Sequence, residues 1–330
     1  MGKINVGIMR GGPSSEYEVS LNTGGEILKY LPEKYSKKDI LLDKKGELFV
    51  NGFFKKPVQV FDLAQGGVNV IFNAMHGEFG EDGRAQQVFE SFNVPYTGSG
   101  IFSSSVAMRK DLSRDIFVRN GIKVPRALFF TADDLFGIDE QYCAKQVFNT
   151  MFSPWVVKPV STGSSVGISV CNSFPELVAG IEDASGYGKA ILIEEYIDGA
   201  EATCGILENF RGQKNYALPV VEIIPPKGSF FDYKVKYDGS THEICPAGFD
   251  NSIKKEIENI ALRAHRVLGC RHYSRADFMI GKKGIYLLEV NTLPGMTAES
   301  LYPKAARAAG LEFPQLLDHL IKLALRLYKI

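Results

Sequence analysis

Hydrophobic residues near the N-terminus occur in short runs, each followed by a polar turn and then by a helical pattern. The run INVGIMRGG precedes a helical pattern over Tyr17–Tyr30, and the run VNVIFNAMHG precedes another near Arg84–Phe92. This alternation of strand, loop and helix predicts a parallel sheet with helices on its faces. Ligands collect at the carboxyl ends of such strands, which here are residues 11–16 and 76–83.

The middle of the chain shows a mixed pattern of helices and strands. A helix is predicted over Met108–Asn120, because Gly121 and Pro125 follow as stop signals. The segments RALFF, PWVVKPV and AILIEEYI are typical of strands, and a further helix is predicted over Pro175–Asp183.

The C-terminal part begins with the β-like segments EATCGIL and NYALPVVEII. Residues 225–250 form a polar and aromatic stretch that is longer than ordinary connections, which favours a lid. An amphipathic helix over Ser252–Leu268, two strands over Tyr273–Ile280 and Ile285–Val290 around a GKKG turn, and two closing helices follow.

These patterns predict three lobes. We place an N-terminal α/β lobe at 1–107, a central lobe at 108–197 and a C-terminal lobe, which carries the loop 225–250, at 198–330. A length of 330 residues is too great for one ordinary core and is compatible with this division.

The composition narrows the class of protein. Hydrophobic residues make up 45% and charged residues 23%, as in ordinary globular proteins. Lys+Arg and Asp+Glu are both 38, so we expect no nucleic acid as the main ligand. No apolar run approaches the roughly 20 residues of a spanning helix, and Met1–Met9 resembles a strand more than a signal peptide. The five cysteines are scattered, which favours reduced thiols in a cytoplasmic protein without a zinc site.

The segment YLLEVN ends a predicted strand with an acid and an amide. Side chains two apart on a strand share a face, so Glu289 and Asn291 point the same way, as do Arg275 and Asp277 on the preceding strand. The short hairpin brings the two pairs together. Carboxylate and amide oxygens suit a hard cation such as Mg²⁺, whereas the alternative is a structural salt bridge from Arg275 to one of the acids.

Two further segments have features of a nucleotide site. In KPVSTGSSVGIS, Lys158 ends an apolar strand before a loop of glycines and hydroxyl residues, which can hold phosphate or can be a plain hairpin turn. In LIEEYIDGAE, the residues Tyr196 and Ile197 offer apolar walls for an adenine, and Glu201 suits a ribose. The alternative for this second segment is an ordinary strand end with solvated acids.

Together these segments resemble the D-alanine–D-alanine ligase family of ATP-grasp enzymes. The resemblance runs nearly end to end and is carried, in order, by GGPSSEYEVSL, MHGEFGEDG, VPYTGSG, MRK, VVKPVSTGSSVG, EEYIDGAE, FFDYKVKY, CPA, RADFMI and LLEVNTLPGMTAES. It implies a three-lobed ATP-grasp ligase with an N-terminal Rossmann-like parallel-sheet domain and two α+β ATP-grasp lobes. It also implies ATP-dependent joining of two D-alanines through an acyl phosphate for peptidoglycan synthesis, usually in a homodimer. From the composition we expect a cytoplasmic protein without nucleic-acid or membrane partners.

The resemblance also implies roles for individual residues. The nucleotide site would comprise Lys110, Val156, Lys158, Ser165, Glu194, Glu195, Tyr196, Ile197, Glu201, Phe230, Lys236, Met279 and Leu288. The ligands of two Mg²⁺ (or Mn²⁺) ions would be Asp277, Glu289 and Asn291. The amino-acid substrates and the reaction would involve Glu16, His76, Ser164, Tyr237, Arg275, Gly295, Ser300 and Leu301, with His76 either as a base or as a hydrogen-bonding residue that orients others.

Three alternatives stay open from the sequence. The second substrate could be D-lactate or D-serine, although Tyr237 argues against lactate because the lactate-using members of the family tend to lack it. The chain could be another ATP-grasp carboxylate–amine ligase. It could also be a nucleotide-binding regulatory protein, against which the intact set of basic and acidic residues speaks.

Overall fold

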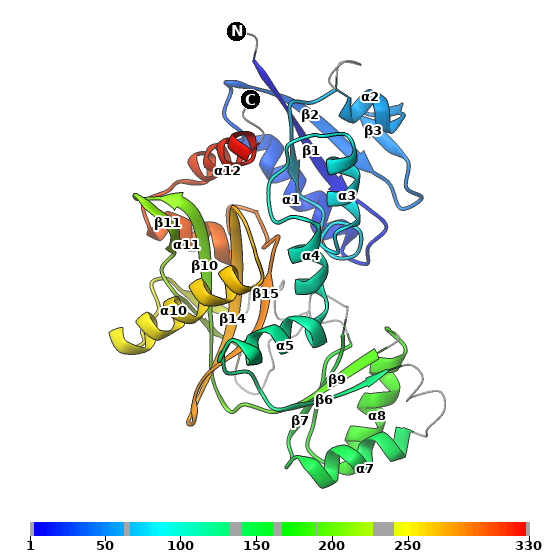
Figure 1. The fold of residues 1–330 in the computed structure, drawn as a ribbon, viewed down its shortest axis with the longest axis vertical. Coiled ribbons are helices and arrows are strands. Elements are labelled where there is room, and N and C mark those ends of the chain that lie inside the picture. Colours follow the sequence, from blue (N-terminus) through cyan, green and yellow to red (C-terminus); the bar gives the residue numbers. More distant parts are fainter. Residues whose placement is uncertain are drawn as a thin grey trace.

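The structure is a computed structural model, and it describes residues 3–62, 67–131, 140–160, 167–188, 190–226 and 241–327. The described residues form three sheets, one after another along the sequence. In the ribbon view they lie along the long axis of the molecule, with the N-terminal sheet at one end and the central sheet at the other (Figure 1).

The N-terminal sheet has a parallel centre, as the alternation of strands and helices predicts. Strand β1 (Ile4–Gly11) pairs in parallel with β2 (Tyr35–Leu42) and with β5 (Val70–Asn73). Its edge is an antiparallel hairpin of β3 (Leu48–Val50) and β4 (Phe53–Lys55), which the sequence analysis missed. The helices of this region are α1 (Tyr17–Tyr30), α2 (Pro57–Phe61) and α3 (Arg84–Ser91).

Two helices connect this lobe to the central sheet. They are α4 (Ile101–Met108) and α5 (Lys110–Arg119). The prediction of one helix from Met108 to Asn120 was wrong at its start, because Arg109 is extended, with φ −92° and ψ 96°. Lys110 is therefore the first residue of a new helix.

The central sheet is antiparallel and has the strand order β6-β9-β7-β8. Its strands are β6 (Ala127–Thr131), β7 (Trp155–Pro159), β8 (Ser169–Cys171) and β9 (Ala190–Glu195). Helices α7 (Glu140–Thr150) and α8 (Phe174–Ser185) enclose a small core around Trp155, which is 1% exposed.

The C-terminal sheet is also antiparallel, with the order β13-β12-β10-β14-β15 and β11 beside β10. The strands are β10 (Gly199–Phe210), β11 (Gln213–Ala217), β12 (Val221–Ile224), β13 (His242–Ile244), β14 (Tyr273–Gly281) and β15 (Gly284–Asn291). The prediction of a continuous loop over 225–250 was wrong in its last part, because β13 pairs with β12. The segment NYALPVVEII forms two strands instead of one, since Leu218–Val220 interrupts it.

Helices complete the core on the C-terminal side. Helix α10 (Asn251–Val267) covers one side of the sheet, and α11 (Leu301–Ala308) contacts β10. Helix α12 (Phe313–Leu327) returns to the N-terminal lobe and contacts β5 and α1 (Figure 1). Its buried leucines share one hydrophobic cluster with Val6, Ile8 and Ile27, so the two ends of the chain form a common core.

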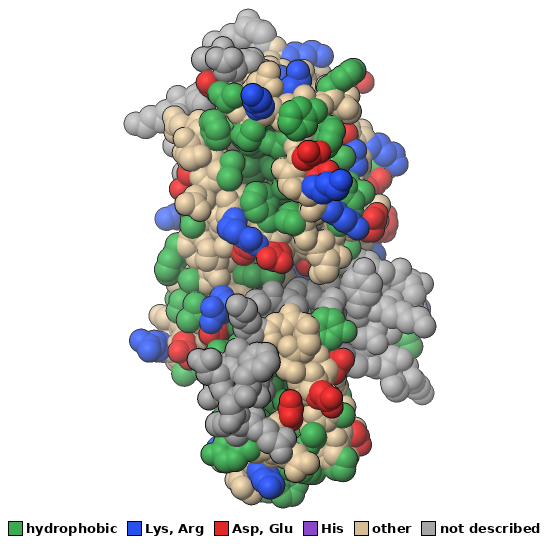
Figure 2. Space-filling view, turned by 90° about the vertical axis from the view of Figure 1, so that its right-hand side faces the viewer, with side chains coloured by type: hydrophobic (Ala, Val, Ile, Leu, Met, Phe, Trp, Pro, Cys, Tyr) green, Lys and Arg blue, Asp and Glu red, His purple; other side chains and the backbone are tan. Residues whose placement is uncertain are grey.

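The surface has a mixed charge on the face seen in Figure 2. Lys and Arg side chains lie among Asp and Glu side chains there, with hydrophobic side chains between them.

None of the helices formed by residues that the structure describes is both long and apolar enough to cross a membrane.

Phe278 provides a test of this packing. Its side chain is completely buried in the cluster that joins β14 to α10, next in sequence to Asp277. Replacing Phe278 with Ala should lower the free energy of unfolding by about 3–5 kcal/mol, because a large cavity remains. Phe278→Leu should cost less than half as much. Denaturant unfolding of both variants measures this, and an equal midpoint for wild type and Phe278→Ala would contradict the packing described.

Candidate active site

A cleft lies between the central sheet and the C-terminal sheet, with helix α5 at its border. Strands β7 and β9 contribute residues from one sheet, and β10, β14 and β15 contribute residues from the other. The lining residues are Lys110, Pro125, Val156, Lys158, Ile168, Glu194, Glu195, Tyr196, Ile197, Glu201, Asp277, Met279, Leu288 and Glu289. All of these except Pro125 and Ile168 belong to the set expected from the sequence.

The acidic end of the cleft is built by the β14–β15 hairpin. In its register Asp277 lies opposite Glu289, and Arg275 lies opposite Asn291. The Asn291 amide donates to Asp277 Oδ2 over 3.0 Å, and Thr203 on β10 donates to Asp277 Oδ1 over 2.7 Å. The hairpin therefore brings the three predicted oxygen donors together, as the spacing of the sequence predicts.

Arg275 forms the salt bridge that was the alternative interpretation. Its Nε and Nη2 atoms donate to the two oxygens of Asp277, both over 2.8 Å. Glu289 lies near a different cation, since its carboxylate is 3.5 Å from Lys110 Nζ. Both acids line the cleft, so the ion pair with Arg275 exists beside a ligand-accessible space.

A β-bulge explains how two successive residues reach the same cleft. The register of β14 and β15 shifts between Asp277 and Phe278, and Leu288 is the residue left without an opposite partner. Strict alternation would turn Leu288 away from the face that carries Glu289. The bulge changes this local direction, so that the acid and its apolar neighbour both line the cleft.

Three charged side chains lie close together on the other wall, and two of them, Glu194 and Lys158, are buried. Glu194 on β9 is 2.6 Å from Lys158 Nζ and 3.3 Å from Arg114 Nη1. Val156 and Glu194 are directly paired, so Lys158, two residues further on β7, extends from the same face. The Lys158–Glu194 contact joins a residue expected at phosphates to one expected at adenine.

The N-terminal lobe contributes a separate group around Gly77. This residue has φ +71°, and a Cβ atom there would lie 2.6 Å from a Glu16 oxygen and 2.3 Å from Ser14 Oγ. Only glycine fits such a position. Glu16 is buried at the start of α1, and its backbone N–H donates to Ser14 Oγ over 2.9 Å.

His76 is held on both sides of its ring. Its Nε2 atom lies 2.9 Å from Thr23 Oγ1, and the ring also bonds to the backbone of Leu293. Burial and, secondarily, the Arg275 charge lower the pKa of His76 to about 4. The imidazole is therefore neutral at neutral pH and is a weak base, which favours the orienting role over the base.

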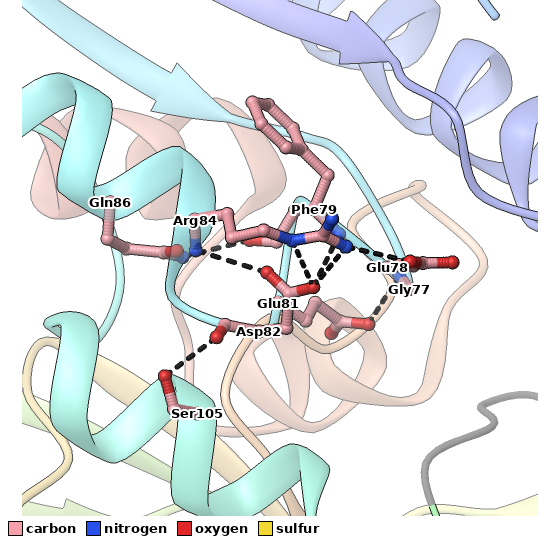
Figure 3. Close-up of polar contacts among 9 residues, drawn as sticks. Gly77, Glu78, Phe79, Glu81, Asp82, Arg84, Gln86 and Ser105 are labelled. Carbon is pink, nitrogen blue, oxygen red and sulfur yellow. Dashed lines mark hydrogen bonds and ion pairs between the residues drawn. The ribbon is translucent and has the colours of Figure 1, made fainter. Parts of the chain in front are cut away.

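Glu81, which was not among the expected site residues, lies in the loop that follows His76. Its carboxylate accepts a hydrogen bond from Gly77 N over 2.7 Å (Figure 3). Burial and, after it, the nearby Glu16 carboxylate raise the pKa of Glu81 to about 8. A buried carboxyl with a raised pKa beside a second acid is typical of functional sites.

The same loop is fixed by a network of polar contacts. Arg84 donates to Asp82 and to Glu78, over 2.6 Å and 2.9 Å (Figure 3). Gln86 donates to Gly80 O over 2.8 Å, and Ser105 on α4 donates to Asp82 O over 2.7 Å. The loop is thereby tied to α3 and α4, so His76 and Glu81 stand on a rigid support.

The comparisons with known proteins agree over nearly the whole chain. Models of the D-ala D-ala ligase N-terminus and C-terminus match residues 51–99 and 116–322. A D-alanine–D-alanine ligase of Syntrophobacter fumaroxidans is 38% identical over 98% of both chains. One of Desulfotalea psychrophila is 38% identical over 98% of this chain and 95% of its own. The chain belongs to the D-alanine–D-alanine ligase family.

Solved structures of this family have the same fold. The VanG D-Ala:D-Ser ligase from Enterococcus faecalis superposes with a TM-score of 0.84 at 30% identity, covering 98% of this chain and 99% of its own. The Bacillus anthracis D-alanine–D-alanine ligase complexed with ATP gives 0.79 at 32% identity and covers 99% of both chains. The expected fold class, an ATP-grasp ligase with an N-terminal α/β lobe and two mixed lobes, is confirmed.

The remaining residues expected from the D-alanine–D-alanine ligase pattern fall in two groups. Gly295 lies beside Ser300, since a Cβ on Gly295 would be 3.1 Å from Ser300 Oγ. Ser300 precedes α11 and bonds to Thr297, while Leu301 packs against the core. The second group lies outside the described residues and comprises Ser164, Ser165, Phe230, Lys236 and Tyr237.

The low pKa of His76 predicts a pH effect on stability. Between about pH 4 and 6.5 the unfolded chain binds a proton at His76 and the folded chain does not, so lowering the pH through this window destabilises the fold. Replacing His76 with Gln should remove this contribution. Thermal unfolding from pH 4 to pH 7 should show that the melting temperature depends less steeply on pH in His76→Gln than in wild type. Identical slopes would refute this contribution of His76.

Proposed function

We propose that this protein joins two D-alanine molecules into D-alanyl-D-alanine, with conversion of ATP to ADP and phosphate, as a step in peptidoglycan synthesis. The observation that carries the proposal is the cleft in which Lys110 and Lys158 face Asp277 and Glu289. Lysines beside carboxylates that suit a divalent cation form an arrangement for polyphosphates. Membership of the D-alanine–D-alanine ligase family, whose relatives carry this activity in their names, supports the same reaction.

ATP would occupy the cleft with its adenine against the apolar residues. Val156, Met279 and Leu288 line the cleft on both sheets, and Ile197 lies at the connection between them. Backbone groups and the acids at 194, 195 and 201 would bind the base and the ribose. Lys110 and Lys158 would contact the phosphates, since Lys110 reaches the cleft from helix α5 and Lys158 reaches it from strand β7.

Magnesium would be held at the hairpin. An Asn291 amide that donates its N–H to Asp277 still has a carbonyl oxygen as a possible ligand, and Glu289 lies directly across from Asp277. The Asp277 oxygens already accept bonds from Arg275, Asn291 and Thr203, so a cation would replace one of these donors. Oxygen donors of these types fit Mg²⁺ or Mn²⁺. Such ions neutralise charge on the transferred phosphoryl group when bound.

In the first step a carboxylate oxygen of one D-alanine forms a bond to the γ-phosphorus of ATP. The bond to the bridging oxygen breaks, which leaves ADP and an acyl phosphate. Glu16 would bind the ammonium group of this D-alanine from the N-terminal lobe. Lys110 and Lys158 would spread the negative charge that develops on the phosphoryl oxygens, and such positioning and electrostatics account for most of the catalysis in phosphoryl transfer.

In the second step the neutral amine of another D-alanine attacks the acyl carbon. The carbon–oxygen bond to phosphate breaks, the phosphate leaves with the proton that the amine gives up, and the dipeptide remains. Arg275 and the backbone N–H of Gly295 would stabilise the oxyanion, with Ser300 and Leu301 near the carboxylate of the second substrate. Because water would hydrolyse the acyl phosphate, Lys236 and Tyr237, in the part of the expected loop that lies outside the described residues, would belong to a lid, together with Ser164.

D-Serine is the second candidate for the second substrate. A D-Ala:D-Ser ligase superposes on this chain with a TM-score of 0.84, which is as good a match as the D-alanine–D-alanine ligases give.

We also propose that the protein is a cytoplasmic homodimer, as expected for the family. Gel filtration with light scattering tests the dimer, and a monomer at micromolar concentration would refute it.

The assay that tests the proposal measures ADP release with a panel of D- and L-amino acids and D-lactate, followed by the mass of the product. Release should require D-alanine, and the product should be the D-alanine dipeptide when both substrates are D-alanine. A mixed product with D-serine at equal substrate concentrations would favour the second candidate. ADP release without any amino acid, or only with L-amino acids, would refute both D-alanine and D-serine as the second substrate.

Glu289 is the residue whose loss should be most damaging. Replacing Glu289 with Gln should lower kcat by at least about 100-fold, because a neutral amide loses the charge that a cation needs. The exposed Glu256→Gln on α10 is the matched control and should keep wild-type turnover. Circular dichroism should show both variants folded. Near-normal turnover of a folded Glu289→Gln protein would remove Glu289 from the mechanism.

A further inference from the structure

Helix α5 carries two cations, one turn apart, that reach different walls of the cleft. Lys110 lies 3.5 Å from Glu289 on β15, and Arg114 lies 3.3 Å from Glu194 on β9. Residues four apart on a helix share a face, so one face of α5 contacts both sheets. Lys110 has an expected role at the phosphates, but nothing in the sequence analysis gave a role to Arg114.

The ion group around Glu194 is well buried. The exposed side-chain fractions are 5% for Glu194, 8% for Lys158 and 18% for Arg114. At such depth the charges are weakly screened, and removing one partner of a buried ion pair is costly. The formal charge of Lys158 with Glu194 alone is zero, whereas Arg114 brings the group to +1.

We propose that Arg114 is a positioning residue for ATP, which shares the Glu194 carboxylate and thereby makes the charge of Lys158 available to the phosphates. The inference rests on the proposed binding of ATP in this cleft. Without Arg114, Lys158 is the only basic partner of Glu194 in this group, so the phosphates must compete with a buried carboxylate for the charge of Lys158. With Arg114, Glu194 keeps a cation while Lys158 contacts the nucleotide.

The account makes a charge-specific prediction for nucleotide binding. Arg114→Gln should weaken the binding of ATP and ADP by at least about tenfold, because the group then has no net charge. Adenosine, which lacks phosphates, should bind within about threefold of its wild-type affinity. Arg119→Gln, an exposed arginine on the same helix, is the matched control and should leave all three affinities unchanged. Equal losses for ATP and adenosine would overturn the proposal.

A second substitution separates charge from structure. In the double variant Arg114→Gln with Glu194→Gln, Lys158 has no carboxylate to neutralise it, so ATP affinity should return to within about threefold of the single Glu194→Gln variant. Arg114→Lys keeps the charge and should bind ATP within about threefold of wild type. The proposal would be overturned if the double variant lost as much ATP affinity as the two single substitutions multiplied together. It would also be overturned if Arg114→Lys bound ATP as weakly as Arg114→Gln.

Isothermal titration with nucleotides in the absence of D-alanine measures these affinities without ligation. The outcome is therefore independent of which amino acids the enzyme joins. If ATP binds wild type and the panel assay gives no dipeptide, the proposed reaction fails while the role of Arg114 is still decided. If ATP binds wild type and Arg114→Gln equally, the role of Arg114 fails while ligation is unaffected.

Discussion

The register of one hairpin determines most of the chemistry of this protein. Because β14 and β15 are antiparallel with Asp277 opposite Glu289, two carboxylates and the Asn291 amide meet at one edge of the C-terminal sheet. A shift of one residue would send these side chains into the hydrophobic core on the other face. The buried Phe278 and Leu287 oppose such a slip, so the packing of the core fixes the position of the polar groups.

Ion pairs line the cleft beside the hairpin, and helix α5 contributes a basic residue to a pair with each of the two sheets. Three acids that line it each have a basic partner: Arg275 lies beside Asp277, Lys110 beside Glu289, and Lys158 with Arg114 beside Glu194. Buried charges persist only when they are paired. The acids and bases of the cleft therefore compensate one another within the protein.

Local patterns predicted some elements well and could not predict others. Helix α1 begins and ends where its amphipathic pattern does, and the hairpin strands follow from spacing alone. Strand β13 has only three residues at a sheet edge and shows no periodicity, so no local pattern distinguishes it from a loop. The contact of Arg114 with Glu194 joins residues 80 apart, and Glu81 acquires its high pKa from groups brought together by folding. Such properties belong to the tertiary structure.

Arg275 connects the two ends of the site. It binds Asp277 through two hydrogen bonds, and its charge also lowers the pKa of His76 and opposes the rise in the pKa of Glu81. His76 and Glu81 belong to the N-terminal lobe, whereas Asp277 belongs to the C-terminal sheet. One guanidinium thus acts on an acid of the cleft and on two titratable groups of the N-terminal lobe.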